Sequence, residues 1–522
     1  MTGRASVGAG LAAAREARQI VPGERIHVVG VGGAGASAAA LLARAAGADP
    51  SGCDAGGPST YTPPLIEAGI RLAWEHSATH VTEPPSPDRL AVTKALTAIQ
   101  PDHPELVAAR RAGIPVEPWQ QVVADAAVGR TLIGVAGTHG KSTSAGWLVH
   151  LLVEAGGDPS AFVGALLPSQ LTGGAAATAR SGRGAAFVVE ADEYAGNFDA
   201  YRPSIAIVTS AEWDHPDVFA DRAAVIAAFD AWLRRARPAA DGSPPVLVAN
   251  VADDGVAELV AGLADWPGRV IATALVDVPA QRFASFARGI AEQYTTAGGP
   301  ATALLGRVAA VTPTSTDLEI HGLDPLRGSL TTRLALAGRH NAANALGVAG
   351  AAAAAGTGAD AIVAGLATFS GVGRRLERKG AAGGVVVYDD YGHHPTAIRL
   401  TLEAIRQREP GHRVWAVYEP LTYHRTAALL DDFATALAGA DGVAIADIWA
   451  GRDPDTTVAS AAGLADAVAR RAPTLPVAAP GSVEATAAWL TSQVRSGDAV
   501  LVMGGGRSYR IAELLLEELE RR

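Results

Sequence analysis

The segment 137–143 has the residue types of a loop that binds phosphate. Backbone N–H groups of such a loop point toward phosphate oxygens, and the first turn of the following helix adds partial positive charge. Lys141 would reach the terminal phosphates, and the Ser142 hydroxyl would bind Mg²⁺. Because Val135 stands where a strict P-loop has its first glycine, a plain glycine turn is the alternative. The nucleotide-binding hypothesis covers the whole segment: Gly137, Thr138, His139, Gly140, Lys141, Ser142 and Thr143.

Lysine is rare in this chain, which makes the lysine in this loop informative. Lysines and arginines together number 43, but lysine occurs only at Lys94, Lys141 and Lys379. A lysine retained against such a bias is a candidate for a task that a planar guanidinium group cannot perform. Lys141 is therefore the first candidate for a catalytic cation.

Acidic side chains gather where two apolar runs end: they are Glu190, Asp192, Glu193, Glu212 and Asp214, followed by His215. Carboxylates this close together need a cation to offset their mutual repulsion. We therefore predict that Ser142, Glu190 and His215 hold Mg²⁺ beside the phosphates of ATP. Two alternatives stay open. The segment 190–193 could be a solvated acidic loop, and His215, an unusual ligand for Mg²⁺, could have a structural role.

A second glycine-rich loop follows the apolar run 26–30. It matches the G-x-G-x-x-G pattern, and an aspartate follows at a distance that suits a nucleotide ribose. This pattern alone fits NAD or any pyrophosphate at a helix N-terminus. Two phosphate loops in successive domains indicate two phosphorylated ligands, which a simple dehydrogenase does not need. The residues concerned are Gly30, Gly32, Gly33, Gly35 and Asp54.

The third group lies toward the C-terminus, where the segment 389–395 directly follows an apolar run. Its histidine pair and aspartates invite a zinc interpretation, but adjacent histidines rarely bind one ion together, so contacts to a nucleotide or an acceptor amine are favoured. Arg374, Arg375 and Arg425 could hold carboxylates or phosphates through their forked donors. Surface ion pairs are the alternative for each arginine.

The elements that must position these groups alternate between apolar strands and helices, with strands expected at 26–30, 131–137, 185–192, 204–211, 384–390, 413–420 and 498–505. Such alternation predicts parallel sheets whose ligand loops lie at the carboxyl ends of the strands. We predict an α/β protein with a Rossmann-like N-terminal domain, a central P-loop ATPase domain with a mostly parallel sheet, and a Rossmann-like C-terminal domain. The expected boundaries are an extension at 1–24 and domains at 25–122, 123–372 and 373–522. The Ala/Gly-rich runs 351–358 and 380–384 are expected to be helix and linker.

Composition narrows the functional classes. The chain has 522 residues, 48% of them hydrophobic, and a net charge of −10, which fits a globular protein of about three domains. The acidic balance argues against a general nucleic-acid binder. The single cysteine, Cys53, cannot close an internal disulfide, which fits a reducing compartment. No apolar stretch approaches the roughly 20 residues of a membrane helix, so a cytoplasmic location without membrane insertion is expected.

Taken together, these segments resemble the Mur ligases, which are ATP-dependent amide-forming enzymes of peptidoglycan precursor synthesis. The resemblance covers about residues 25–515 and rests on motifs in the family's order and spacing: GTHGKST (137–143), EADE (190–193), E-x-D-H (212–215), GRHNAANAL (338–346), FSGVGRRLE (369–377) and DDYGHHPTAIR (389–399). It points to the branch that adds L-alanine to UDP-N-acetylmuramate. Several other branches use a carbamylated lysine in the central domain, and no lysine lies between Lys141 and Lys379.

The resemblance implies a reaction in which ATP converts the lactyl carboxylate of UDP-N-acetylmuramate to an acyl phosphate. The amine of L-alanine then attacks and phosphate leaves. Positioning and cations dominate such chemistry, because charge concentrates on the transferring phosphoryl group. The resemblance places Lys141 at that group and the glycine loop 30–35 at the UDP pyrophosphate.

The remaining residues carried over from the family divide between two ligands: Asn341 and Asn344 near the adenine, Arg375 and Asp390 at the phosphate and ribose side of the nucleotide, and Tyr391, His393 and Arg425 on the acceptor side. Arg425 is a natural partner for the carboxylate of the amino acid. The incoming ammonium must lose a proton, and either His393 or His215 could accept it. The sequence does not choose between these two histidines.

Departures from the family's pattern concentrate on the sugar-nucleotide and acceptor sides, at Ala195, Ser210, Leu421, 92–106 and 504–509. The ATP and metal residues are nearly intact. Two alternatives therefore accompany the alanine ligase: a Mur-ligase-like enzyme with another acceptor or donor, such as a murein-peptide recycling ligase, and a non-catalytic nucleotide-binding paralog. The oligomeric state could be a monomer or a homodimer.

Overall fold

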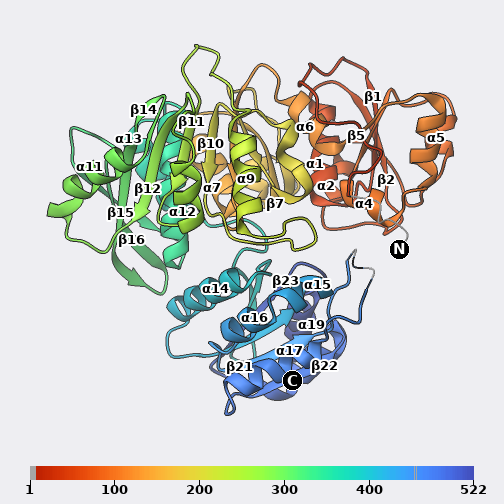
Figure 1. The fold of residues 1–522 in the computed structure, drawn as a ribbon. Coiled ribbons are helices and arrows are strands. Elements are labelled where there is room, and N and C mark those ends of the chain that lie inside the picture. Colours follow the sequence, from red (N-terminus) through yellow and green to blue (C-terminus); the bar gives the residue numbers. More distant parts are fainter. Residues whose placement is uncertain (1–6, 452, 454) are drawn as a thin grey trace.

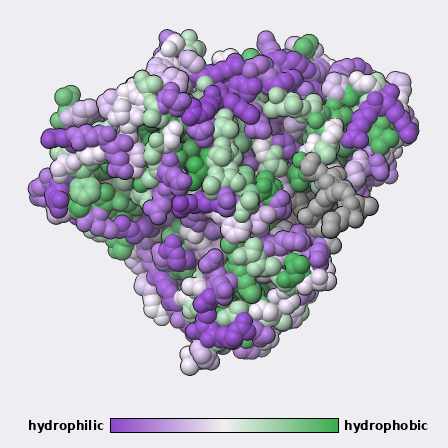
Figure 2. Space-filling model, in the orientation of Figure 1, coloured by the Kyte–Doolittle hydropathy of each residue, from purple (hydrophilic) through white to green (hydrophobic). Residues whose placement is uncertain are grey.

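Residues 7–451, 453 and 455–522 are described by a computed structural model, in which three α/β domains are each built on a separate main sheet (Figure 1). The N-terminal domain (red to orange) and the central domain (yellow to green) lie side by side, and the C-terminal domain (blue) lies below them. Figure 2 shows hydrophilic and hydrophobic residues interspersed over this face of the molecule. Among the described residues, no helix is both long and apolar enough to cross a membrane. The predicted three-domain α/β architecture is confirmed.

The N-terminal domain contains a parallel sheet in the order β3-β2-β1-β4-β5. This order is that of a Rossmann-like sheet, and it places the central strand β1 directly before the glycine loop. The strands are β1 (Arg25–Val29), β2 (Asp49–Cys53), β3 (Arg71–Ala73), β4 (Arg89–Val92) and β5 (Val116–Pro118). The helices are α1 (Ala34–Ala45), α2 (Pro63–Glu67), α3 (Thr79–Thr82), α4 (Lys94–Ile99), α5 (Pro104–Ala112) and α6 (Trp119–Ala126).

The central domain contains a ten-stranded sheet in the order β17-β16-β15-β12-β11-β10-β6-β9-β7-β8. The strands from β15 to β7 in this order are parallel, whereas β8, β16 and β17 pair antiparallel at the two edges. The strands are β6 (Thr131–Ala136), β7 (Ser160–Leu167), β8 (Ala177–Arg180), β9 (Ala186–Glu190), β10 (Ile205–Val208), β11 (Val246–Asn250), β12 (Arg269–Leu275), β15 (Thr302–Thr312), β16 (Ser315–His321) and β17 (Ser329–Leu334), with a separate hairpin of β13 (Thr295–Thr296) and β14 (Gly299–Pro300).

Helices pack on both faces of the central sheet, and two of them carry predicted site residues in their first turns. They are α7 (Lys141–Glu154), α8 (Ser169–Thr172), α9 (Arg222–Leu233), α10 (Asp254–Ala261), α11 (Phe283–Gln293), α12 (Arg339–Ala354) and α13 (Ala359–Thr368), with 3-10 turns η1 (Tyr194–Ala200) and η2 (Ala280–Arg282). Helix α7 follows the phosphate loop and α12 carries the two asparagines assigned to the adenine. The sheet therefore brings both elements to one side of the domain, where α7 and α12 contact each other.

The C-terminal domain has a sheet in the order β18-β19-β23-β20-β21-β22, parallel except for β18. Its strands are β18 (Glu377–Ala382), β19 (Val385–Asp390), β20 (Arg413–Glu419), β21 (Gly442–Ala446), β22 (Val477–Gly481) and β23 (Asp498–Gly504), and its helices are α14 (Pro395–Arg408), α15 (Tyr423–Ala428), α16 (Leu430–Leu437), α17 (Ala461–Arg471), α18 (Val483–Gln493) and α19 (Tyr509–Glu520). The expectation of a linker at 380–384 was wrong. Gly383 and Gly384 have φ of 58° and 76°, and such a two-residue turn joins β18 and β19 as a hairpin.

The segment before β1 contacts two domains. Arg15 pairs with Asp125 in α6 at 2.7 Å, and the neighbouring Glu16 pairs with Arg202 of the central domain at 2.9 Å. These contacts attach the segment to the junction between the first two sheets.

Candidate active site

The phosphate loop connects the end of β6 to the first turn of α7. Gly140 has φ of 80°, a conformation that residues with a side chain rarely adopt. A Cβ at this position would lie 2.6 Å from Asn344 Oδ1, so α12 packs directly against the loop. Asn344 Nδ2 donates to Asn341 Oδ1 at 3.3 Å, and the two asparagines thus lie together beside the loop.

Residues that follow β10 form hydrogen bonds with the phosphate loop. The carbonyl oxygen of Ser210 accepts from the Thr138 N–H at 3.1 Å, and the Ser210 hydroxyl accepts from the His139 N–H at 2.9 Å. Thr138 Oγ1 in turn accepts from the N–H of Glu212 at 2.9 Å. The departure at Ser210 therefore retains a side chain that supports the loop.

The ammonium group of Lys141 lies between a buried carboxylate, Glu193, and a partly exposed one, Asp192. Its Nζ is 2.8 Å from Glu193 Oε2 and 3.5 Å from Asp192 Oδ1. Burial opposes the charge of Lys141, but these carboxylates outweigh burial and raise its pKa. Burial also raises the pKa of Glu193 to about 7, although Lys141 acts against that shift. A second cation at this cluster would relieve the remaining negative charge.

The predicted metal ligands divide into two neighbouring groups. Ser142 Oγ donates to Glu190 Oε1 at 2.9 Å, and the other carboxylate oxygen of Glu190 accepts from the Gly164 N–H at 2.6 Å. His215 instead lies with Asp192 and Glu193, and one ligand atom from each of these three lies within 4.8 Å of the others. Hydroxyl and carboxylate oxygens are the ligands that Mg²⁺ prefers, so the donor set fits this ion.

His215 also lies at the contact with the C-terminal domain. It has φ of 58°, and Arg425 donates to its Nδ1 at 3.0 Å. The same guanidinium group pairs with Asp214 Oδ1 at 2.7 Å. Burial lowers the pKa of His215, although Asp214 acts in the opposite direction. His215 is therefore mainly neutral at pH 7. Arg425, from the C-terminal domain, contacts two residues of the central domain.

The two adjacent histidines of the C-terminal domain have different partners. His393 Nδ1 lies 2.9 Å from the carbonyl oxygen of Tyr391. His394 Nε2 lies 3.2 Å from the carbonyl oxygen of Trp213, and its Nδ1 accepts from Thr396 at the start of α14. The two rings therefore contact different segments, His393 its own loop and His394 the segment that follows β10. Burial and Arg425 hold the pKa of His393 well below its ordinary value.

The arginine assigned to the nucleotide reaches the phosphate loop. Arg375 donates to Ser142 Oγ at 2.8 Å, and its guanidinium carbon lies 5.1 Å from the ring centroid of Tyr391. The carboxylate of Asp390 accepts from the N–H groups of Leu376 and Gly392, each at 2.7 Å. Asp390 thus fixes the two loops that carry Arg375 and Tyr391.

The aspartate predicted to contact a ribose, Asp54, lies against the N-terminal glycine loop. Asp54 Oδ2 accepts from the Gly32 N–H at 3.0 Å, and a Cβ at Gly32 would lie 2.8 Å from that oxygen. Gly30 and Gly33 are joined by a backbone hydrogen bond of 3.1 Å. A Cβ at Gly35 would lie 2.1 Å from the Trp119 ring, so this glycine admits α6 against α1. The first turn of α1 still presents N–H groups that no intrahelical acceptor can reach.

Two residues of the candidate active site had no individual role in the prediction. Asp214 pairs with Arg425, and its place beside His215 in the E-x-D-H motif was a usable signal. Gly164 binds Glu190, and a Cβ there would lie 2.9 Å from Glu190 Oε1. No local signal marks Gly164, because its position depends on β7 pairing with β9.

Family models match three successive parts of the chain: the catalytic domain of the Mur ligase family at 25–131, the Mur ligase middle domain at 135–352, and the glutamate ligase domain of Mur ligases at 374–506. A UDP-N-acetylmuramate–L-alanine ligase of Frankia casuarinae is 36% identical over 521 residues, which is 95% of this chain and 98% of that protein. The chain belongs to the Mur ligase family. Its members use ATP, and the resemblance inferred from the motifs is confirmed.

Solved structures of Mur ligases share this fold. The UDP-N-acetylmuramate–alanine ligase of Thermotoga maritima has a TM-score of 0.73 and 21% identity, over 95% of this chain and 99% of that chain. A murein peptide ligase of Psychrobacter arcticus has a TM-score of 0.68 and 24% identity, over 96% and 99%. At these identities the similarity establishes the three-domain architecture of the Mur ligases.

Proposed function

We propose that this Mur ligase joins L-alanine to the lactyl carboxylate of UDP-N-acetylmuramate at the expense of ATP, a reaction of peptidoglycan precursor synthesis. The observation that carries the proposal is the 36% identity to a UDP-N-acetylmuramate–L-alanine ligase over nearly the whole of both chains. The lack of lysine between Lys141 and Lys379 agrees with this branch. It leaves no residue that could become the carbamylated lysine used by several other Mur ligases.

In this proposal the loop 137–143 binds the ATP phosphates, and Lys141 neutralises charge on the group that is transferred. Ser142 and Glu190 would hold Mg²⁺, while Asp192 and Glu193 flank the ammonium group of Lys141. His215 would join Ser142 and Glu190 as a ligand once Arg425 no longer donates to its Nδ1. The ion, when bound, would offset the negative charge of the phosphates.

The geometry favours His393 as the base that accepts the ammonium proton. If Nδ1–H of His393 donates to the Tyr391 carbonyl, its Nε2 keeps a free lone pair. The Nδ1 lone pair of His215 is already engaged by Arg425. Arg425 has further donors with which to bind the carboxylate of the amino acid while it remains paired with Asp214.

The test is phosphate release from ATP with UDP-N-acetylmuramate and each standard amino acid in turn. We expect L-alanine to give the highest kcat/KM and no turnover without the sugar nucleotide. A requirement for a free tripeptide in place of L-alanine would instead indicate a recycling ligase. Tight ATP binding without turnover on any acceptor would indicate a non-catalytic paralog.

A further inference from the structure

One carboxylate in the N-terminal domain is surrounded by histidines and by the only cysteine of the chain. Glu105, on α5, is fully buried. The sulfur of Cys53 lies 3.1 Å and 3.2 Å from its two oxygens. Four of the 13 histidines place a ring nitrogen near these oxygens: His80 at 2.5 Å, His27 and His103 at 3.7 Å, and His76 at 3.8 Å. We call these six residues the Glu105 cluster, which lies outside the proposed active site.

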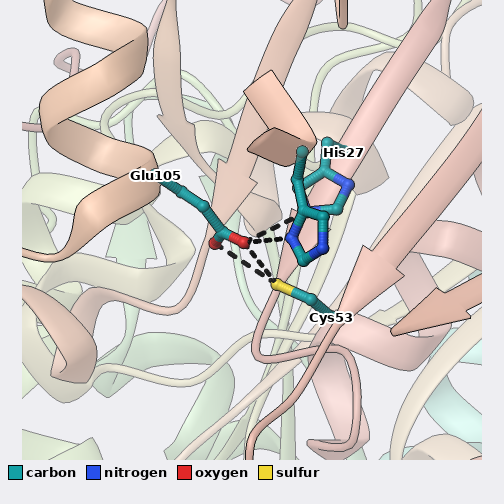
Figure 3. A group of neighbouring side chains, drawn as sticks. His27, Cys53 and Glu105 are labelled. Carbon is teal, nitrogen blue, oxygen red and sulfur yellow. Dashed lines mark hydrogen bonds and ion pairs between the residues drawn. The ribbon is translucent and has the colours of Figure 1, made fainter. Parts of the chain in front are cut away.

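The fold brings the cluster together from separate elements. His27 pairs with Ser51, and Val29 pairs with Cys53, in the parallel register of β1 and β2. Because side chains alternate along a strand, His27 and Cys53 lie on the same face of the sheet. His27 Nδ1 lies 2.9 Å from Ser51 Oγ, which directs Nε2 toward Glu105 (Figure 3).

Several nitrogens of the cluster are buried without a hydrogen-bond partner. They are His27 Nε2 and both ring nitrogens of His103, in side chains whose residues are 3% and 1% exposed. Buried polar atoms are nearly always satisfied, so each such orphan requires an explanation. For His27 Nε2, a cation that accepts the imidazole lone pair would supply one, whereas His103 lies beside the carboxylate of Glu105.

We propose that the Glu105 cluster is a Zn²⁺ site in which His27, Cys53, His80 and Glu105 are the ligands. Imidazole, thiolate and carboxylate are the ligands that Zn²⁺ takes in proteins. One thiolate and one carboxylate balance the charge of the ion, so the assembled site is neutral despite its burial. His76 and His103 face the other oxygen of Glu105 and would orient its carboxylate.

One atom from each of the four ligands lies within 4.8 Å of the others, and small shifts of Cys53 and His80 away from Glu105 would suit a tetrahedral ion. Ligand bonds of about 2.0–2.3 Å place tetrahedral ligands roughly 3.3–3.8 Å apart. Glu105 Oε1 lies 3.1 Å from the Cys53 sulfur and 3.7 Å from His27 Nε2. His80 must move away from Glu105, and it lies on the four-residue helix α3. Binding would replace the Cys53 thiol proton, which leaves to solvent, by a sulfur–zinc bond.

Such a site would also support the glycine loop. The carbonyl oxygen of Cys53 accepts from the N–H groups of Gly30 and Val31 at 2.9 Å and 3.1 Å, and the next residue, Asp54, holds Gly32. An ion bound to Cys53 would therefore fix the end of β2, to which the backbone of this loop is hydrogen-bonded.

The test uses the untagged full chain, stripped of metal under reducing conditions and titrated with Co²⁺. A thiolate–cobalt bond gives an intense charge-transfer absorption in the near ultraviolet. Because Cys53 is the only cysteine, that absorption can come from no other residue, and Co²⁺ at the oxygen ligands of Ser142 and Glu190 would not produce it. We expect saturation at one Co²⁺ per chain and loss of the band when Zn²⁺ is added.

Matched variants locate the site. Cys53→Ser should abolish the band, and Glu105→Gln should weaken Co²⁺ binding at least tenfold. His412→Gln, which changes a partly exposed histidine near Glu409, should leave both unchanged. Zn²⁺ should raise the unfolding temperature of the wild type but not of Cys53→Ser. Absence of the band in the wild type with a titratable Cys53 thiol would overturn the proposal and leave the cluster as a hydrogen-bonded network.

Discussion

Arg425 lies 2.7 Å from Asp214, and this ion pair joins the C-terminal domain to the segment that follows β10. Both side chains are buried, with 4% and 6% of their surfaces exposed. Loss of one partner of a buried pair leaves the other as an uncompensated charge. The pair therefore links the two domains in the observed arrangement, in which Arg425 also reaches His215.

Replacing Arg425 with alanine is expected to lower kcat/KM for the amino acid by about 10²-fold, the usual cost of truncating a buried charge pair. Affinity for ADP, measured by calorimetry, should change little because the nucleotide loop lies in the central domain. Arg399→Ala removes an exposed arginine paired with Glu403 on α14 and serves as the control. An unchanged KM for the amino acid in Arg425→Ala would contradict the acceptor-side role.

Lys141→Arg is expected to lower kcat by at least about 10²–10³-fold, the range found when one group that stabilises developing charge is removed. The wider guanidinium group cannot occupy the position of an ammonium enclosed by Asp192 and Glu193. Lys379→Arg is the matched control, because Lys379 forms only a partly exposed pair with Glu377 at 3.2 Å. Steady-state phosphate release measures both variants, and near-normal turnover of Lys141→Arg would refute the proposed role.

The sequence predicted the parallel strands and the loops at their ends because each is marked locally. The apolar run before Gly137 and the helix after Lys141 place the phosphate loop without any tertiary information. Strands β16 and β17 were not among the expected strands. They lack the continuous apolar run of the parallel strands, and their burial patterns mix buried with more exposed positions. The rarity of lysine directed attention to Lys141. It says less about Lys94, whose ammonium group donates to the backbone carbonyl oxygens of Ala195 and Gly196.

Contacts between distant segments could not be predicted. Asp390 was assigned to the nucleotide side, but its two hydrogen bonds to backbone N–H groups depend on how the loops before and after β19 meet. The Glu105 cluster combines residues from β1, β2, α3, α5 and the connecting loops. The sequence marked only the departure at 92–106, within which His103 and Glu105 lie, and not what surrounds them.

The pH dependence of the reaction should reflect a neutral buried histidine. Burial and Arg425 lower the pKa of His393 well below 6.5, so the unprotonated form persists as the pH falls to that value. Activity is then lost only as the pH falls through the lowered pKa, and the acid limb of kcat/KM should lie below pH 6.5. His393→Gln should lower kcat by about 10²–10⁴-fold and remove this limb, whereas His412→Gln should preserve both. An acid limb centred above 6.5 would exclude His393 as the base.

The stability of the N-terminal domain should depend on Arg89, which is 2% exposed and lies 3.0 Å from Glu24, 2.9 Å from Glu117 and 2.6 Å from Asp125. Arg89→Met keeps a long apolar side chain but removes the buried cation that three carboxylates share and leaves them only the partly exposed Arg15 and Arg18. We therefore expect a loss of about 3 kcal/mol in the free energy of unfolding, the lower end for a broken buried pair. Arg71→Met, at an exposed arginine on β3, should cost about 0–1 kcal/mol. Urea unfolding followed by circular dichroism measures both changes, and equal midpoints for the two variants would show that Arg89 has no special structural role.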